Sequence, residues 1–172
     1  MQINQEPIKN RVDESGIITF NLEEYFPNDE IMNFDLQPFL FQGLILREKD
    51  YRKALSEFDF EPFKNKTACI FCSADAIVPI WAFMLAATYL QPVAAKVFYG
   101  TAEQFIQQAM TDELQKINFK SFQAQRLVIK GCGEKPVPAG VYVAITNFLL
   151  PFAKTIMYGE PCSTVPLFKR KD

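Results

Sequence analysis

The chain has 172 residues, of which 49% are hydrophobic and 14% aromatic, so it is long enough and apolar enough to bury a core of its own. This composition excludes a disordered chain. The net charge of −2 gives no bulk attraction to nucleic acid or to an anionic membrane, and neither partner is expected.

The N-terminal segment, residues 1–46, combines a polar start with two patterned stretches. Its first residues, MQINQEPIKNRVDESG, lack the apolar run of a secretory signal, which favours a cytoplasmic location. Residues 16–26 alternate as a half-exposed strand does, and residues 35–46 predict a turn of helix followed by an edge strand. The longest apolar run, residues 77–90, is shorter than the ~20 residues that span a bilayer, so no membrane-spanning helix is expected.

After this segment the same series of elements occurs twice. Each series begins with an amphipathic helix, continues through a Phe-x-x-Phe link into a short apolar strand, and then reaches a proline at the first turn of a second helix. The second helix is apolar nearly all round, so we expect it to be buried. The predicted strands are residues 66–72, 95–99, 126–131 and 154–159, and the predicted helices are residues 47–58, 80–94, 102–117 and 139–153.

An internal repeat accounts for this recurrence. When the sequence is compared with itself, residues 55–100 align with residues 114–159 without a gap, and 11 of the 46 pairs are identical. Ordinary residue usage gives roughly three identities in such a comparison. We interpret the pattern as an ancestral duplication.

The order of elements predicts an α/β fold with a mainly parallel sheet covered by helices, because parallel neighbours need crossover connections. We expect a single domain over residues 1–172. It would consist of the N-terminal strand region, two tandem pseudo-symmetric αβαβ repeats at residues 47–100 and 106–159, and a C-terminal tail at residues 160–172. The sequence does not determine the oligomeric state, nor whether a second chain completes the sheet.

Three of the four cysteines follow predicted strands and precede a Val-Pro dipeptide. Cys72, Cys132 and Cys162 each lie at or just past the carboxyl end of a strand, which is the edge where open α/β sheets bind ligands. The Val-Pro dipeptide begins a helix after the first two, and at Val165-Pro166 we expect it to end a strand. Cys69 lies within a strand instead, and is expected to be a core residue.

A metal site is the sharpest chemical hypothesis for these cysteines. Thiolates from three adjacent loops, with Asp75 or Glu134 nearby, would suit zinc, iron or an iron–sulfur cluster with a further ligand from elsewhere. The spacing matches no compact ligand motif such as C-x₂-C. Redox chemistry between two of the thiols is a second possibility.

Structural explanations for the same residues also exist. Cysteine is small enough for a tight turn after a strand, and the repeat does not superpose the cysteines, because Cys72 aligns with Gly131 and Cys132 aligns with Ser73. Asp75 and Glu134 align with each other, and they could cap the helices that follow.

Several motifs together resemble an uncharacterised bacterial family, found chiefly in Bacteroidetes and named domain of unknown function 2480. The motifs are GLILREKDYR, CSADAIVP followed by W-A-x-M-L, KGC with KPVP, and GEPCSTVPLFKRK. The resemblance extends from about residue 11 to residue 171. It implies a small cytoplasmic protein without an assigned catalytic residue, and it associates the family with iron–sulfur cluster assembly proteins as partners.

Three functions therefore compete. The first is a metal or iron–sulfur binding accessory protein that uses Cys72, Cys132 and Cys162. The second is a non-catalytic protein-interaction module in which the cysteines are incidental. The third is an enzyme with a thiol nucleophile, which the absence of histidine disfavours because it removes the usual Cys-His pair.

Overall fold

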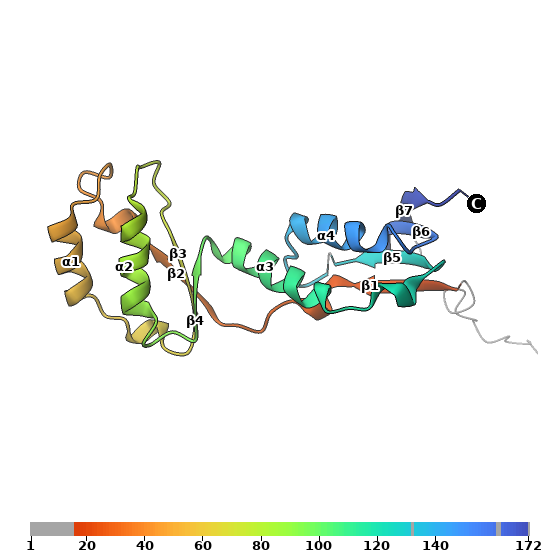
Figure 1. The fold of residues 1–172 in the computed structure, drawn as a ribbon, viewed down its shortest axis with the longest axis horizontal. Helices are drawn as coiled ribbons and strands as arrows, with labels where there is room; N and C mark the ends of the chain where they lie inside the picture. The colour runs from red at the N-terminus through yellow and green to blue at the C-terminus, as the bar shows by residue number, and fades with distance from the viewer. Residues whose placement is uncertain (1–15, 132, 161–162, 172) are drawn as a thin grey trace, which may run out of the picture. The chain divides into compact units, whose positions relative to one another are not determined.

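The computed structural model describes residues 16–131, 133–160 and 163–171 (Figure 1). The chain divides into two compact units. Unit 2 is the continuous stretch Pro27–Gln108, and unit 1 combines the residues up to Phe26 with those from Ala109 onward. The α/β class with largely parallel strands is confirmed, but the strands form two sheets where the sequence predicted one. The single domain stays a prediction.

Unit 2 is built on a parallel sheet of three strands in the order β2-β3-β4. Helix α1 connects β2 to β3 and helix α2 connects β3 to β4. Short 3-10 turns follow β2 and precede β3. The elements are β2 (Ile31–Asp35), α1 (Glu48–Glu57), β3 (Thr67–Phe71), α2 (Ile80–Leu90) and β4 (Lys96–Tyr99).

The core of unit 2 is unusually rich in aromatic rings. Phe34 of β2 is buried at its centre, and four phenylalanine rings lie with their centroids within 6.0 Å of its own. Helix α1 supplies Tyr51 and Leu55 from its apolar stripe, as the helical spacing predicts. The Tyr51 hydroxyl donates a hydrogen bond to the carbonyl oxygen of Ala82, at 3.1 Å, which connects α1 to α2.

Unit 1 contains a four-stranded sheet in the order β1-β5-β6-β7. The first three strands are parallel and β7 is antiparallel to β6. Helix α3 begins in unit 2 and ends in unit 1. The elements are β1 (Ile17–Asn21), α3 (Ala102–Gln115), β5 (Arg126–Lys130), α4 (Ala139–Leu149), β6 (Thr155–Glu160) and β7 (Ser163–Lys169).

The two units share one arrangement of elements. The first residues of β5, α4 and β6 are the ones that the repeat aligns with the first residues of β3, α2 and β4. The registers agree as well, since Thr67 lies opposite Lys96 in unit 2 and Arg126 lies opposite Thr155 in unit 1. A strand from the N-terminal segment completes each sheet, β2 beside β3 and β1 beside β5. Duplication remains an interpretation of this agreement.

Two expectations about individual strands were wrong. Residues 35–46 contain the expected helical turn but only isolated bridges after it, and the strand of this region is β2. The chain does not end its strand at Val165-Pro166, because β7 continues through Pro166. Proline is tolerated there because β7 lies at the sheet edge, next to a register irregularity in its pairing with β6.

The second helices of the repeats were expected to be buried, and they are buried on one face only. In α2, Ala82, Ala86 and Leu90 are buried, whereas Ile80 and Met84 are exposed. In the described part of the chain, no helix has the length and apolar character needed to cross a membrane.

Candidate functional site

The structure describes three of the five residues proposed as metal ligands. Cys72 lies half-buried just past the end of β3, and Asp75 is exposed in the loop that follows. Both belong to unit 2, whereas Glu134 is exposed in the β5–α4 loop of unit 1. Cys132 and Cys162 lie outside the described residues. Within the described ranges, no group of three cysteine or carboxylate side chains is placed to hold a metal ion.

The two described cysteines differ as the sequence predicts. Cys69 is buried inside β3, and burial raises the pKa of its thiol to about 11. Cys72 is partly accessible, and its thiol donates to the carbonyl oxygen of Ala74 across 3.7 Å. Cys69 is therefore a core residue, and Cys72 is the described cysteine that a ligand could reach.

Polar side chains at the carboxyl ends of the unit 2 strands bind one another. The Asp35 carboxylate accepts hydrogen bonds from the backbone and hydroxyl groups of Ser73 and from the backbone of Gln37. Burial raises the pKa of the Asp35 carboxyl, but the hydrogen bonds from Ser73 and Gln37 outweigh it and hold the pKa below its ordinary value. These hydrogen bonds connect the segment after β2 to the loop after β3.

At the same edge of unit 1, Glu23 binds the loop that follows β5. Its carboxylate accepts hydrogen bonds from the backbone N–H groups of Gly133 and Glu134, and its carbonyl oxygen accepts one from the Lys135 ammonium group. Asp75 and Glu134 do not cap the helices that follow. The N-cap residues are Pro79 and Pro138, and neither has a side-chain capping bond.

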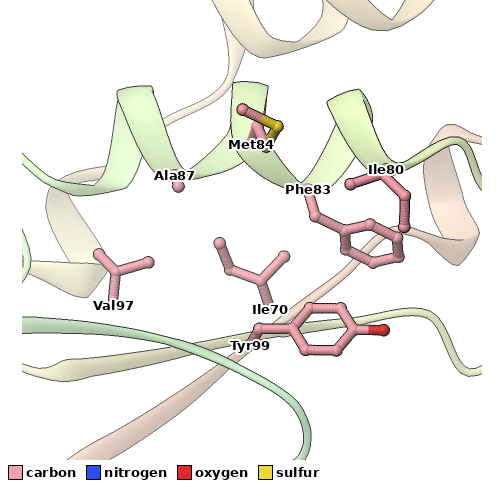
Figure 2. Close-up of a pocket in the computed structure, with 7 residues that line it drawn as sticks. All are labelled: Ile70, Ile80, Phe83, Met84, Ala87, Val97 and Tyr99. Atoms are coloured by element: carbon pink, nitrogen blue, oxygen red, sulfur yellow. The ribbon is translucent and has the colours of Figure 1, made fainter.

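An apolar concavity of unit 2 lies between α2 and β4, and we call it the α2–β4 groove (Figure 2). It encloses about 430 Å³. Side chains from α2 lie on one side of it, and side chains from β3 and β4 lie on the other. The lining residues are Ile70, Ile80, Phe83, Met84, Ala87, Val97 and Tyr99. None of them carries a charge.

Large apolar side chains surround the groove and remain open to solvent. Ile80 is 73% exposed, Met84 65% and Tyr99 69%. Ile77, in the loop before α2, is 91% exposed and lies beside Ile45, another exposed isoleucine. These residues were not predicted, because the apolar pattern of α2 favoured burial of the whole helix. The indication was present, since a helix that is apolar all round but covered on one side leaves an apolar face uncovered.

The equivalent concavity of unit 1 is smaller, at about 270 Å³, and it is lined by Ile129, Ala139, Tyr142, Thr146, Tyr158 and Leu167. The repeat aligns five of these residues with lining residues of the α2–β4 groove. Ala139 replaces Ile80 in this comparison, which reduces the apolar surface. The sixth, Leu167, comes from β7, for which unit 2 has no counterpart among its described strands.

Comparison with known proteins gives one family and no closer relative. Neither the curated proteins nor the solved structures contain a match to the chain. The model of one protein family matches residues 6–170, which is nearly the whole of the 172-residue sequence. The chain therefore belongs to the family described as Protein of unknown function (DUF2480).

Proposed function

We propose that the protein is a non-catalytic protein-interaction module of the cytoplasm, and that the α2–β4 groove of unit 2 is its binding surface. The observation that supports this proposal is the exposure of Ile80, Met84 and Tyr99 around a concave apolar lining. Contiguous exposed apolar side chains on a folded protein mark a surface that another molecule covers.

The contrast between the units supports the choice of surface. At the positions equivalent to Ile77 and Ile80, unit 1 has Pro136 and Ala139. Burying a large aliphatic side chain stabilises a complex by about 1.5–3 kcal/mol more than leaving it in water. Unit 2 therefore carries two exposed isoleucines whose burial would contribute strongly to binding, and unit 1 has a proline and an alanine in their place.

A photo-cross-linking experiment tests this surface directly. We expect a photoreactive phenylalanine analogue at position 84, introduced in the native host cells, to give a discrete covalent adduct with a protein. Position 143 is the matched control, because Val143 occupies the equivalent site on α4 and is 62% exposed. The protein in the adduct would be identified by mass spectrometry, purified, and tested for binding to the wild-type chain and to Met84→Lys.

The proposal requires an adduct at position 84 that is absent at position 143, and a partner whose affinity falls at least tenfold with Met84→Lys. Absence of any adduct at position 84, or equal labelling at both positions, would contradict it. A cross-link from position 84 to another segment of the same chain would also contradict it, because the groove would then be covered internally.

The three-cysteine metal site is a second proposal, supported by the accessibility of Cys72 at the end of β3. On this proposal, Cys72, Cys132 and Cys162 bind zinc, iron or an iron–sulfur cluster, with Asp75 or Glu134 as further ligands. Protein purified without oxygen is then expected to contain metal, with visible absorption if the metal is iron. The content would be measured by elemental analysis.

Serine at position 72, 132 or 162 should remove most of the metal, because a lost thiolate leaves too few ligands. Cys69→Ala is the control, since Cys69 is buried within β3, and it should retain the metal. Metal-free protein from an anaerobic preparation would refute the metal site and leave the interaction surface unaffected.

A further inference from the structure

The outer edge of β4 offers hydrogen-bonding groups that no described strand uses. The backbone N–H groups of Lys96 and Gly100 donate to carbonyl oxygens of Lys66 and Ile70, on the β3 side. Backbone groups of alternate residues in a strand point to opposite sides, so those of Val97 and Tyr99 point to the outer edge. In the described part of the chain, β4 pairs with β3 alone.

Unit 1 shows which kind of strand this edge accepts. β6, the equivalent of β4, has its outer edge covered by the antiparallel strand β7. Tyr158, the equivalent of Tyr99, lies opposite Val165 of β7. From the same strand, Leu167 lines the concavity beside α4. An antiparallel strand with a valine opposite the tyrosine therefore completes this type of sheet.

We propose that a second copy of this chain completes unit 2, by antiparallel pairing of β4 with the β4 strand of the second copy around a two-fold axis. This inference rests on the proposed function, because it names the protein that covers the α2–β4 groove. The product is a continuous six-stranded sheet in the order β2-β3-β4-β4-β3-β2.

The sequence of β4 is self-complementary in this pairing. With Phe98 opposite Phe98 of the second copy, Tyr99 lies opposite Val97, which repeats the Tyr158–Val165 pair of unit 1. The outward groups of Val97 and Tyr99 then form hydrogen-bonded pairs on both sides of the axis, because directly opposite residues exchange both bonds. Aromatic and β-branched cross-strand neighbours further stabilise such a pair.

The charge on β4 does not oppose the pairing. Its one charged residue, Lys96, is neutralised within the chain by Asp29, whose carboxylate oxygen lies 2.6 Å from the Lys96 ammonium nitrogen. The same register places Lys96 opposite Gly100 of the second copy, where there is no side chain to collide with. Edge strands that avoid association carry charged side chains, lysine especially, or proline; β4 has no proline, and its single lysine is paired with Asp29.

The pairing also covers the apolar surface beside the strand. A two-fold axis perpendicular to the sheet keeps both α2 helices on the same face. The exposed residues Ile80, Met84 and Tyr99 of each copy then lie along the line where the two copies meet. An isologous interface requires a patch that matches itself, and an uncharged apolar patch satisfies that requirement.

Mass measurement in solution tests the inference. We expect the purified full chain to sediment with twice its monomer mass of 19.7 kDa, over concentrations from micromolar to hundreds of micromolar. Val97→Pro removes an outward N–H group of β4 together with a side chain that lines the groove, but it keeps the N–H groups of Lys96 and Gly100 that donate toward β3, and it should convert the dimer to a monomer. Met84→Lys should do the same, because it places like charges near the axis, whereas Val143→Lys on α4 should leave the dimer intact.

Circular dichroism and the fluorescence of Trp81 would verify that each variant remains folded. A monomeric wild-type chain at the highest concentration would overturn the inference, as would a dimer that persists in both Val97→Pro and Met84→Lys. Either result is distinguishable from failure of the proposed function. If the dimer inference fails and the proposed function holds, the photo-adduct at position 84 contains a different protein, and the groove remains the binding surface.

Discussion

Replacing Phe34 with alanine is expected to destabilise unit 2 by about 3–5 kcal/mol, the usual cost of removing a buried aromatic ring. Phe34 is almost completely buried, and it packs against Phe39, Phe58, Phe60 and Phe63. These rings come from the segments after β2, after α1 and before β3, and all of them pack against Phe34. No single neighbour is therefore able to fill the cavity left by alanine. A loss of this size approaches the whole stability of many small domains.

Denaturant unfolding followed by tryptophan fluorescence is the appropriate measurement. Trp81 is the single tryptophan of the chain and lies in unit 2, with its ring centroid 6.3 Å from that of Tyr51. Phe34→Leu is the matched control, and it should cost less than about 1.5 kcal/mol because it keeps most of the buried volume. A cost below about 1.5 kcal/mol for Phe34→Ala as well would show that the aromatic cluster does not depend on Phe34.

Gly159→Ala is expected to destabilise the β6–β7 pairing of unit 1 by about 2–5 kcal/mol, from backbone strain and a steric clash together. The φ angle of Gly159 is +117°, which L side chains rarely adopt, and an added Cβ would lie 2.6 Å from the carbonyl oxygen of Ser163. That oxygen belongs to the backbone of β7, so the clash can be relieved only by moving the strand. We expect faster amide hydrogen exchange along β7 in this variant.

Gly16→Ala provides a control for the backbone strain alone. Gly16 also has a positive φ angle, +61°, but nothing lies within 4 Å of its added Cβ. This variant should cost about 1–2 kcal/mol and leave the hydrogen exchange of β7 unchanged. If β7 exchanged at the wild-type rate in Gly159→Ala, the β6–β7 pairing would not require glycine at position 159 and the prediction would fail.

The elements of the two repeats were predictable because their local patterns are strong. The four strands predicted there differ from β3, β4, β5 and β6 by no more than one residue at either end. Apolar runs bounded by polar loops set those limits, and Pro79 and Pro138 mark where α2 and α4 begin. Cys69 was assigned to the core for the same reason, because it lies within an apolar strand.

Of the strands outside the repeats, β1 lies within residues 16–26, where the alternation predicted a strand, whereas β2 and β7 were not predicted from local pattern. β2 has the sequence IMNFD, in which Asn33 interrupts a short apolar run, and β7 contains a proline. Each is a strand because a partner is available, β3 for one and β6 for the other. The presence of two sheets also depends on pairing. β1 and β2 have similar sequences, but β1 pairs with β5 and β2 pairs with β3.

The candidate binding surface was not predicted, because which residues of an apolar helix are buried depends on the packing of the whole unit. Met84 and Ala86 both occur in one uninterrupted apolar helix, yet Ala86 is buried and Met84 is exposed. The three-cysteine hypothesis depends on two residues, Cys132 and Cys162, that lie outside the described part of the chain, and it stays a prediction. The sequence identified the elements well, but not which faces of them remain uncovered.

The insertion of unit 2 between β1 and the rest of unit 1 determines the order in which the chain can fold during translation. β1 pairs with β5, and β5 leaves the ribosome only after the whole of unit 2, Pro27–Gln108, has been made. Unit 2 has all of its strands by then and can fold as a nascent chain, while β1 must wait without its neighbour. On the proposed pairing, the outer edge of β4 can therefore form before β5 has been made, and neighbouring nascent chains of the same sequence would supply its first partners.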